Sequence, residues 1–110
     1  MISNYHLETV GIAPIYTSVK NNAITTIIAC NVGEIDENDE KANSCRLTLY
    51  LVPHGQACSF RNMIVKELII PAGETVFFSD EKVILSNNDT VYAEASAPGL
   101  LTITISTLPV

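Results

Sequence analysis

The sequence predicts an all-β protein: a single antiparallel β-sandwich, Ig-like or jelly-roll-like, with little or no helix. In the segment 101–107, apolar and hydroxyl side chains alternate strictly as far as Ser106, and residues 46–51 alternate nearly as well. This period-two alternation is typical of a strand with one buried face. Turn-forming residues recur about every 8 to 12 positions, which is the spacing of a sandwich or barrel.

The first half of the chain contains two expected strands. Residues 25–30 are rich in β-branched side chains, which favour extended backbone. The strand over residues 46–51 ends at a turn that contains Pro53 and Gly55. Because Cys45 is in phase with the alternating leucines that follow it, we expect its side chain to point inward.

The stretch over residues 60–70 permits two interpretations. Its first part places apolar side chains at helical spacing after Ser59, a residue suited to cap a helix. Residues 65–70 suit a strand, and we favour the strand. Residues 75–78 follow a turn marked by Pro71 and Gly73 and form another expected strand.

A turn is also expected at residues 87–89, which read Asn-Asn-Asp. Asn and Asp tolerate the left-handed backbone angles of tight turns. Residues 82–85 precede this turn and residues 91–95 follow it, and both are rich in apolar side chains. We therefore predict that the two segments pair as a hairpin.

Composition limits the class of protein. The 110 residues suffice for one hydrophobic core, so we expect a single domain over residues 1–110. The chain is 47% hydrophobic and only 16% charged, which excludes a disordered chain and suggests that a partner covers part of the apolar surface. No apolar stretch approaches the roughly 18 residues of a membrane helix, so no membrane partner is expected.

The net charge of −6 and the first residues add two expectations about partners and location. Few cations are present to displace the counterions of phosphate groups, so we expect no nucleic-acid partner. Residues 1–6 lack a basic segment that an apolar run follows. We therefore expect no secretory signal, and synthesis in a cytoplasm.

An acidic stretch supplies most of the negative charge. Its five acids, with Lys41 beside them, account for four of the six net charges. We expect an exposed acidic hairpin loop over residues 32–44, and its acids are candidate interaction residues: Glu34, Asp36, Glu37, Asp39 and Glu40.

Three of these acids are weak candidates for a hard cation, which prefers oxygen ligands: Asp36, Asp39 and Glu40. The stretch lacks the central glycine and the final glutamate of an EF-hand loop. We therefore favour a solvated loop over a metal site.

No group of residues predicts catalysis. His6 and His54 lie far apart in the sequence, and neither belongs to a nucleophile motif. Glycoside cleavage would need two acids that face one cleft, and nothing in the sequence brings together Glu67, Glu74 or Glu94. We therefore expect a protein that is not an enzyme and that uses no cofactor.

The three cysteines are Cys30, Cys45 and Cys58. No two of them have the CxxC spacing of a metal knuckle or redox motif. Reduced and buried thiols are the expectation. A bridge between Cys30 and Cys45 stays open if their strands are neighbours.

Two tyrosines on expected strands suggest an alternative function. Tyr50 and Tyr92 fall on the face opposite the apolar one, where aromatic rings can stack on sugars or on protein surfaces. They are therefore candidate interaction residues, and a carbohydrate-binding module for a host surface glycan is the alternative hypothesis. The chain contains no Trp, and cross-strand packing also accounts for these tyrosines.

The order of several short motifs resembles a known group of proteins. Residues 49–55 read LYLVPHG, residues 71–75 read PAGET, and residues 93–97 read AEASA before the final alternating strand. Nearer the N-terminus, residues 15–17 and the pair Cys30-Asn31 resemble the group's first strand pair and a strand end. In this order they resemble small tailed-bacteriophage virion accessory proteins. The acidic stretch is where this chain departs from the group, which usually has a short turn there.

The resemblance implies a non-enzymatic virion structural protein: a capsid decoration, neck, tail or fibre-associated protein. It further implies a homo-oligomer that docks on other virion proteins, located in the virion after synthesis in the host cytoplasm. The residues agree with such a role, because symmetric assemblies can cover an apolar excess.

Overall fold

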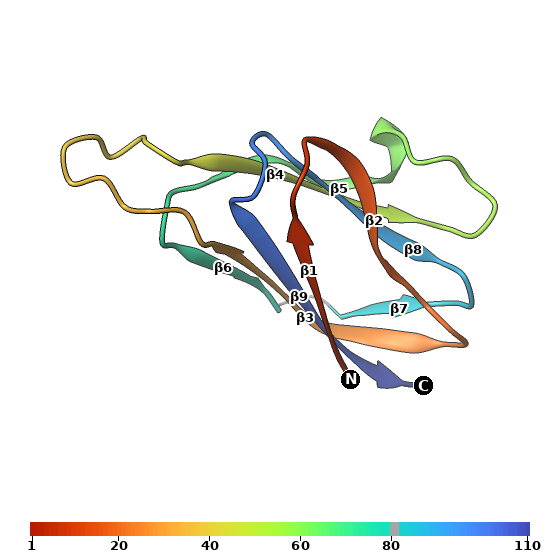
Figure 1. Ribbon diagram of the computed structural model, residues 1–110. Helices are drawn as coiled ribbons and strands as arrows, with labels where there is room; N and C mark the ends of the chain where they lie inside the picture. The colour runs from red at the N-terminus through yellow and green to blue at the C-terminus, as the bar shows by residue number, and fades with distance from the viewer. Residues whose placement is uncertain (80–81) are drawn as a thin grey trace.

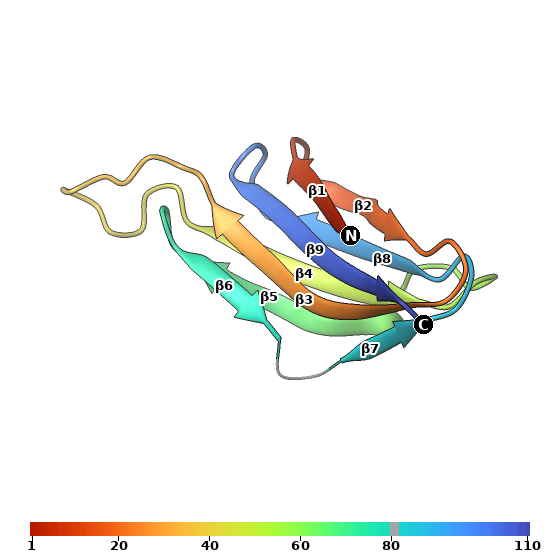
Figure 2. The ribbon, with the colours of Figure 1, turned by 90° about the horizontal axis from the view of Figure 1, so that it is seen from below.

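The computed structural model describes residues 1–79 and 82–110 and confirms the all-β prediction. Two antiparallel sheets pack face to face, and the N- and C-termini lie close together at one end of the sandwich (Figures 1 and 2). The elements in chain order are β1 (Ile2–Leu7), β2 (Gly11–Thr17), β3 (Asn22–Asn31), β4 (Cys45–Val52), the 3₁₀ turn η1 (Phe60–Asn62), β5 (Met63–Ile70), β6 (Thr75–Phe78), β7 (Val83–Leu85), β8 (Thr90–Ala95) and β9 (Leu101–Pro109).

The strand pairs are nested along the chain. The five-stranded sheet has the order β1-β9-β3-β6, with β7 also paired to β3, and the four-stranded sheet has the order β2-β8-β4-β5. The first strand thus pairs with the last, the second with the eighth, and β4 with β5. This arrangement selects the jelly-roll alternative over the Ig-like one.

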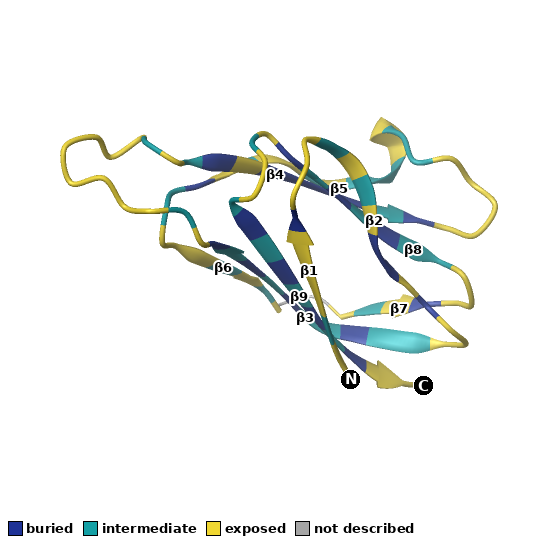
Figure 3. Cartoon of the chain, in the orientation of Figure 1, coloured by how far each residue is buried: buried dark blue, intermediate teal, exposed yellow. Residues whose placement is uncertain are grey.

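Alternation along the strands builds the core. Leu101, Ile103, Ile105 and Thr107 of β9 are at most 2% exposed, while the residues between them are half-buried. Buried residues likewise follow the inner faces of β3, β4 and β8 (Figure 3). Cys45 points inward as expected and is 1% exposed.

The predicted hairpin of residues 82–85 with residues 91–95 is wrong. β7 pairs with β3 in the five-stranded sheet, and β8 pairs with β2 and β4 in the other sheet. The turn between them does form, but its backbone bonds to the β2–β3 connection. Asn88 N donates to Ser18 O over 2.7 Å, and Ser18 N donates to Asp89 O over 2.9 Å.

The predicted acidic hairpin over residues 32–44 is also wrong in its connectivity. The strands that flank it, β3 and β4, belong to different sheets. The segment therefore crosses from one sheet to the other at the end of the sandwich (Figure 1). We call residues 32–44 the acidic crossover.

The ambiguous stretch contains both kinds of structure that we weighed. Ser59 caps η1: its side chain accepts from Arg61 N, and its own backbone N donates to Asn62 Oδ1 over 3.1 Å. The helical turn ends at once, and β5 begins at Met63. The strand that we favoured is confirmed over residues 65–70.

Alternation in the sequence did not reveal β1 or β2. β1 is an edge strand whose residues are mostly exposed, so it needs no regular apolar pattern. β2 contains Pro14, which lacks the N–H that an interior strand requires. The proline is tolerated because β2 is an edge strand with a bulge between Pro14 and Tyr16.

The three cysteines are free thiols. Cys30 lies in the five-stranded sheet and Cys45 in the four-stranded sheet, so the strands of the considered bridge are not neighbours. Within the described residues, no helix has the length and the apolar character that crossing a membrane requires.

Two adjacent isoleucines of β5 test the assignment of inner and outer faces. Ile70 is 0% exposed, and its neighbour Ile69 is 58% exposed. Ile70→Ala should lower the free energy of unfolding by about 2–5 kcal/mol, because it leaves a cavity in the core. Ile69→Ala should change it by less than about 0.5 kcal/mol. Urea denaturation measures both values, and similar losses for the two variants would contradict the assignment.

Candidate interaction surfaces

The buried amide of Asn31 anchors the acidic crossover where it leaves β3. Asn31 is 1% exposed, and its Nδ2 donates to Ile70 O and to Asn43 O, each over 2.8 Å. Its Oδ1 accepts from Gly33 N over 2.8 Å. One side chain thus joins the end of β3 to the end of β5 and to both ends of the crossover.

The same residue joins two of the motifs that the sequence singled out. Asn31 N donates to Glu74 O over 2.9 Å, and Gly73 N donates to Asn31 O over 3.0 Å. The strand end Cys30-Asn31 therefore meets the turn of the PAGET motif. Gly73 has a φ of 80°, and a Cβ on it would lie 2.7 Å from Ile35 Cδ1, so glycine allows the crossover to rest on this turn.

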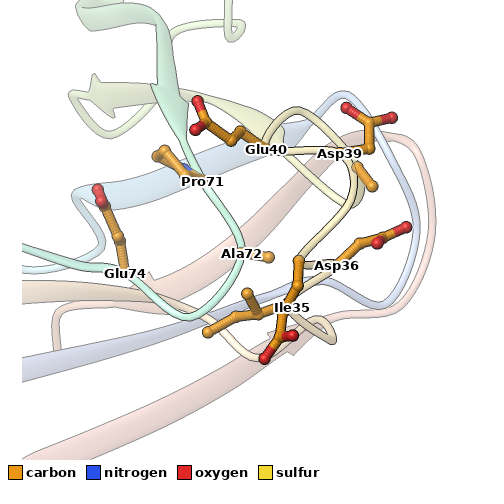
Figure 4. A pocket seen from close by; sticks show the side chains of 9 residues that line it. Ile35, Asp36, Asp39, Glu40, Pro71, Ala72 and Glu74 are labelled. Carbon is orange, nitrogen blue, oxygen red and sulfur yellow. The ribbon is translucent and has the colours of Figure 1, made fainter.

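The three acids that the sequence suggested for a cation do not converge on one point. Asp36, Asp39 and Glu40 line a hollow of about 420 Å³ together with Pro71 and other residues, but their carboxylates point in different directions (Figure 4). Over residues 1–79 and 82–110, no three His, Cys, Asp or Glu side chains are grouped closely enough to hold a metal ion.

Two of these carboxylates have local backbone partners instead. Asp36 Oδ1 accepts from Asn38 N over 2.9 Å, and Asp39 Oδ1 accepts from Lys41 N over 3.0 Å. All five candidate acids of the crossover lie at its surface, Glu34 and Glu37 included. The crossover therefore presents its negative charge to solvent at one end of the sandwich.

Tyr50 lies on the outer face of the four-stranded sheet, as predicted, but its ring is not free to bind a ligand. It is directly opposite Tyr92 on β8 and is only 4% exposed. Its hydroxyl donates to Glu94 Oε1 over 3.0 Å. Burial and then the neighbouring Glu94 raise the pKa of Tyr50 to about 12. Burial is also the main cause that raises the pKa of the Cys58 thiol.

Tyr50 stays a candidate interaction residue by its outward position only, because little of its ring is accessible. The ring is buried even though it faces away from the core. Tyr92 is half-buried, so only one of the two rings of the suggested sugar platform is accessible.

The same outer face brings together two acids that nothing in the sequence linked. Glu67 of β5 and Glu94 of β8 line one hollow of about 140 Å³. Arg46 also lines it and belongs to β4, the strand between these two. Glu74 lies elsewhere, against the acidic crossover. The outer face of the four-stranded sheet is thus a charged surface.

The outer face of the five-stranded sheet differs in charge, although both outer faces expose large apolar side chains, such as Ile12 and Ile69 on the four-stranded sheet. The strands β1, β9, β3, β6 and β7 contain no Asp, Glu, Lys or Arg, in a chain that carries 18 charged residues. Their outward side chains are hydroxyl, amide and apolar groups, together with the imidazole of His6 and the thiol of Cys30. Four large apolar side chains are 57–68% exposed there: Ile2, Phe77, Ile84 and Leu108. We call this surface the neutral face.

Hydrogen bonds hold the polar side chains of the neutral face flat on the sheet. Thr104 Oγ1 lies 2.8 Å from Asn4 Oδ1, and His6 Nδ1 lies 2.8 Å from Thr102 Oγ1. These four side chains therefore keep a hydrogen-bond partner when the face is covered, which lowers the cost of burying them.

Comparison with known proteins shows the fold. No known family and no curated protein matches the sequence. A chain in the acid-stable capsid structure of Helicobacter pylori bacteriophage KHP30 has a similar fold, with a TM-score of 0.55 and 9% sequence identity. The similarity covers 100% of this chain and 91% of that one.

Sequence reasoning missed two features of these surfaces. The first is Asn31, whose only signal was its place at a strand end before Gly33. The second is the neutral face, because charge-free segments are noticeable only when the strands that form one sheet are known. The exposed position of the acidic residues was visible in the sequence itself.

Replacing the anchoring amide tests its role. Asn31→Asp removes both donors and places a carboxylate against the carbonyls of Ile70 and Asn43, so the free energy of unfolding should fall by roughly 3 kcal/mol. Asn43→Asp is the matched control, since its amide makes one exposed bond, to Glu34 O. Chemical denaturation measures both changes. Equal losses would contradict the anchoring role.

The raised pKa of Tyr50 predicts a loss of stability at alkaline pH. Between the ordinary value of 10.0 and about 12, the unfolded chain loses the phenolic proton while the folded protein keeps it. Unfolding then releases a proton, so stability falls as the pH rises through this range. The advantage of the wild type over Tyr50→Phe, about 1 kcal/mol below pH 10, should shrink towards pH 12. A constant difference in urea denaturation would contradict this.

Proposed function

We propose that this protein is a non-enzymatic structural protein of a bacteriophage virion, and that it docks as a decoration on the capsid through its neutral face. The observation that carries the proposal is the neutral face itself. Its five strands contribute no Asp, Glu, Lys or Arg, on a protein of net charge −6, and four large apolar side chains are mostly exposed there.

A face of this kind has a higher free energy in water than in a complex that covers it. When a partner covers exposed apolar side chains, the free energy falls by about 25 cal/mol for each Å² of apolar surface removed from water. Contiguous apolar patches that polar residues surround are typical of interaction sites. A docked capsid protein would cover Phe77 and Ile84, and the nearby Lys82 ammonium already bonds to Thr25 O and Ser79 O. Docking would therefore desolvate few charges, and desolvation is the main cost of covering charged surfaces.

The fold supports the proposal at a coarser level. Jelly rolls are used in viral capsids and also in lectins. A fold alone does not define a function. The similarity to a chain of a phage capsid structure, together with the motif order described above, favours the virion over a lectin. The experiment described next can instead assign the protein to the neck, the tail or the fibres.

Particle composition tests the proposal directly. Mass spectrometry of purified particles from the source of the gene should detect the chain in many copies per particle, in fractions that also contain the capsid protein. Its presence in tail fractions alone would assign the protein to the tail and not to the capsid. Its complete absence from particles, or specific binding on a glycan array that Tyr92→Ala abolishes, would overturn the proposal.

Charge insertion tests the docking face. Phe77→Lys places an ammonium on the neutral face, and we expect at least tenfold weaker binding to capsids that lack the protein. Ile69→Lys is the matched control on the outer face of the other sheet, because Ile69 is similarly exposed. Sedimentation with capsids measures both. A loss with Ile69→Lys alone would assign docking to the four-stranded sheet.

The acidic crossover can be separated from the neutral face in the same assay. Neutralising Asp36, Glu37, Asp39 and Glu40 together should weaken binding mainly at low salt, because salt screens exposed charges. Unchanged binding at every salt concentration would leave docking to the neutral face.

A further inference from the structure

The edges of the two sheets differ in how they prevent pairing with other strands. An edge strand presents unpaired N–H and C=O groups, and proteins protect such edges with prolines, bulges, charges or short strands. β2 carries Pro14 and a bulge. β5 has two irregularities in its pairing with β4, and it carries Lys66 and Glu67, whose φ is 48°. Both edges of the four-stranded sheet are therefore protected.

One edge of the five-stranded sheet is protected by interruption. It is formed by β6 and β7, which have four and three residues and pair with different halves of β3. Beside this edge, Lys82 Nζ donates to Thr25 O over 2.9 Å and so occupies a backbone acceptor. A foreign strand would find neither a long nor a continuous row of free groups there.

β1 forms the remaining edge and has none of these devices. It runs without a bulge from Ile2 to Leu7, contains no proline and no charged residue, and pairs along its whole length with β9. Met1 and Thr107 exchange two backbone hydrogen bonds, of 2.7 and 2.8 Å. Bonded pairs alternate in antiparallel sheets, so Ser3, Tyr5 and Leu7 bond to β9. The N–H and C=O groups of Ile2, Asn4 and His6 therefore point to the open edge.

The side chains of β1 leave this edge accessible. Asn4 bonds to Thr104, and His6 bonds to Thr102, so both side chains lie over β9. Within residues 1–79 and 82–110, β1 pairs with no strand other than β9. The edge is thus a continuous row of backbone donors and acceptors.

We propose that β1 is the site where a second copy of this chain pairs, antiparallel, about a two-fold axis at Asn4. The two Asn4 residues would exchange N–H to C=O bonds, and Ile2 of each copy would pair with His6 of the other. This register uses every free group of both edges. It also joins the two five-stranded sheets and their neutral faces into one continuous surface. In that respect the inference rests on the proposed function, which uses this face for docking.

Among the sheet edges, β1 is the one where a second copy meets the least charge repulsion. Each copy carries −6, and the acidic crossover holds most of that charge. The crossover follows β3 and rests on the turn before β6, and β6 and β1 are at opposite edges of the five-stranded sheet (Figure 2). Pairing through β1 keeps the two crossovers apart, and no charged side chain of β1 or β9 lies at the contact.

A proline at the axis tests the inference without disturbing the β1–β9 pairing. Asn4→Pro removes an N–H that β9 does not use, and the extended backbone of β1 accepts the ring. Analytical ultracentrifugation should show the wild type approaching twice its 11.9 kDa as concentration rises, and the variant dissociating at least tenfold more readily. Asn4→Ala is the matched control and should still dimerise.

Two further measurements test the inference if the proline variant folds poorly. Asn4→Lys opposes two ammonium groups at the axis and should weaken the dimer most at low salt. Hydrogen exchange on the wild type should show the amides of Ile2, Asn4 and His6 becoming protected as concentration rises. The amides of Ser3, Tyr5 and Leu7 should be protected at every concentration.

The outcomes separate this inference from the proposed function. A wild type that stays at 11.9 kDa, or a dimer that Phe77→Lys abolishes and Asn4→Pro leaves intact, would overturn the β1 pairing. A monomer that is nevertheless abundant in particles would overturn the pairing alone. A dimer that Asn4→Pro dissociates, in a protein absent from particles, would overturn the virion function alone.

Discussion

The buried amide of Asn31 is the interaction on which the arrangement of the two sheets most depends. The chain leaves the five-stranded sheet at this residue and enters the four-stranded sheet only at Cys45. Three hydrogen bonds of 2.8 Å fix the crossover between them, and the backbone of Asn31 holds the turn before β6. Every donor and acceptor of this amide is satisfied, so the polar group costs little where it is buried. The crossover can therefore carry five acids and still keep a defined position.

Charge is distributed unequally over the sandwich, and the proposed docking surface follows from this distribution. Turns, the acidic crossover and the four-stranded sheet carry the charged side chains, while the five-stranded sheet has none. A sheet with one face in water normally alternates between apolar and polar residues. Here the outward positions include Thr, Ser, Asn, His, Cys, Ile, Leu and Phe, which suit a surface that is wet at one stage and covered at another. The neutral face and the unprotected β1 edge belong to the same sheet, so docking and self-pairing would use adjoining surfaces.

Local alternation allowed much of the fold to be predicted. The strands at residues 46–51 and 101–107 were predicted because each buries one face, which imposes period two on the sequence. Strand pairing could not be predicted in the same way. The turn at residues 87–89 is a strong local signal, yet in a nested jelly roll the strands that flank it enter different sheets. β1 escaped notice because an exposed edge strand has no face that must be apolar. The outward position of Tyr50 was predictable, but its burial was not, since neighbours distant in sequence cover it.

The sequence by itself determined an all-β domain, the leucines and isoleucines that face inward, and the acids that lie at the surface. It also determined that the cysteines lack the spacing of a metal motif. These properties follow from side-chain chemistry and from the two-residue period of a strand, both of which are local. Only the tertiary structure decided that β1 pairs with β9, that Asn31 anchors the crossover, and that five charge-free strands form one face. Each of these depends on contacts between residues tens of positions apart. Such contacts are chosen by the packing of the whole core, and no short segment encodes them.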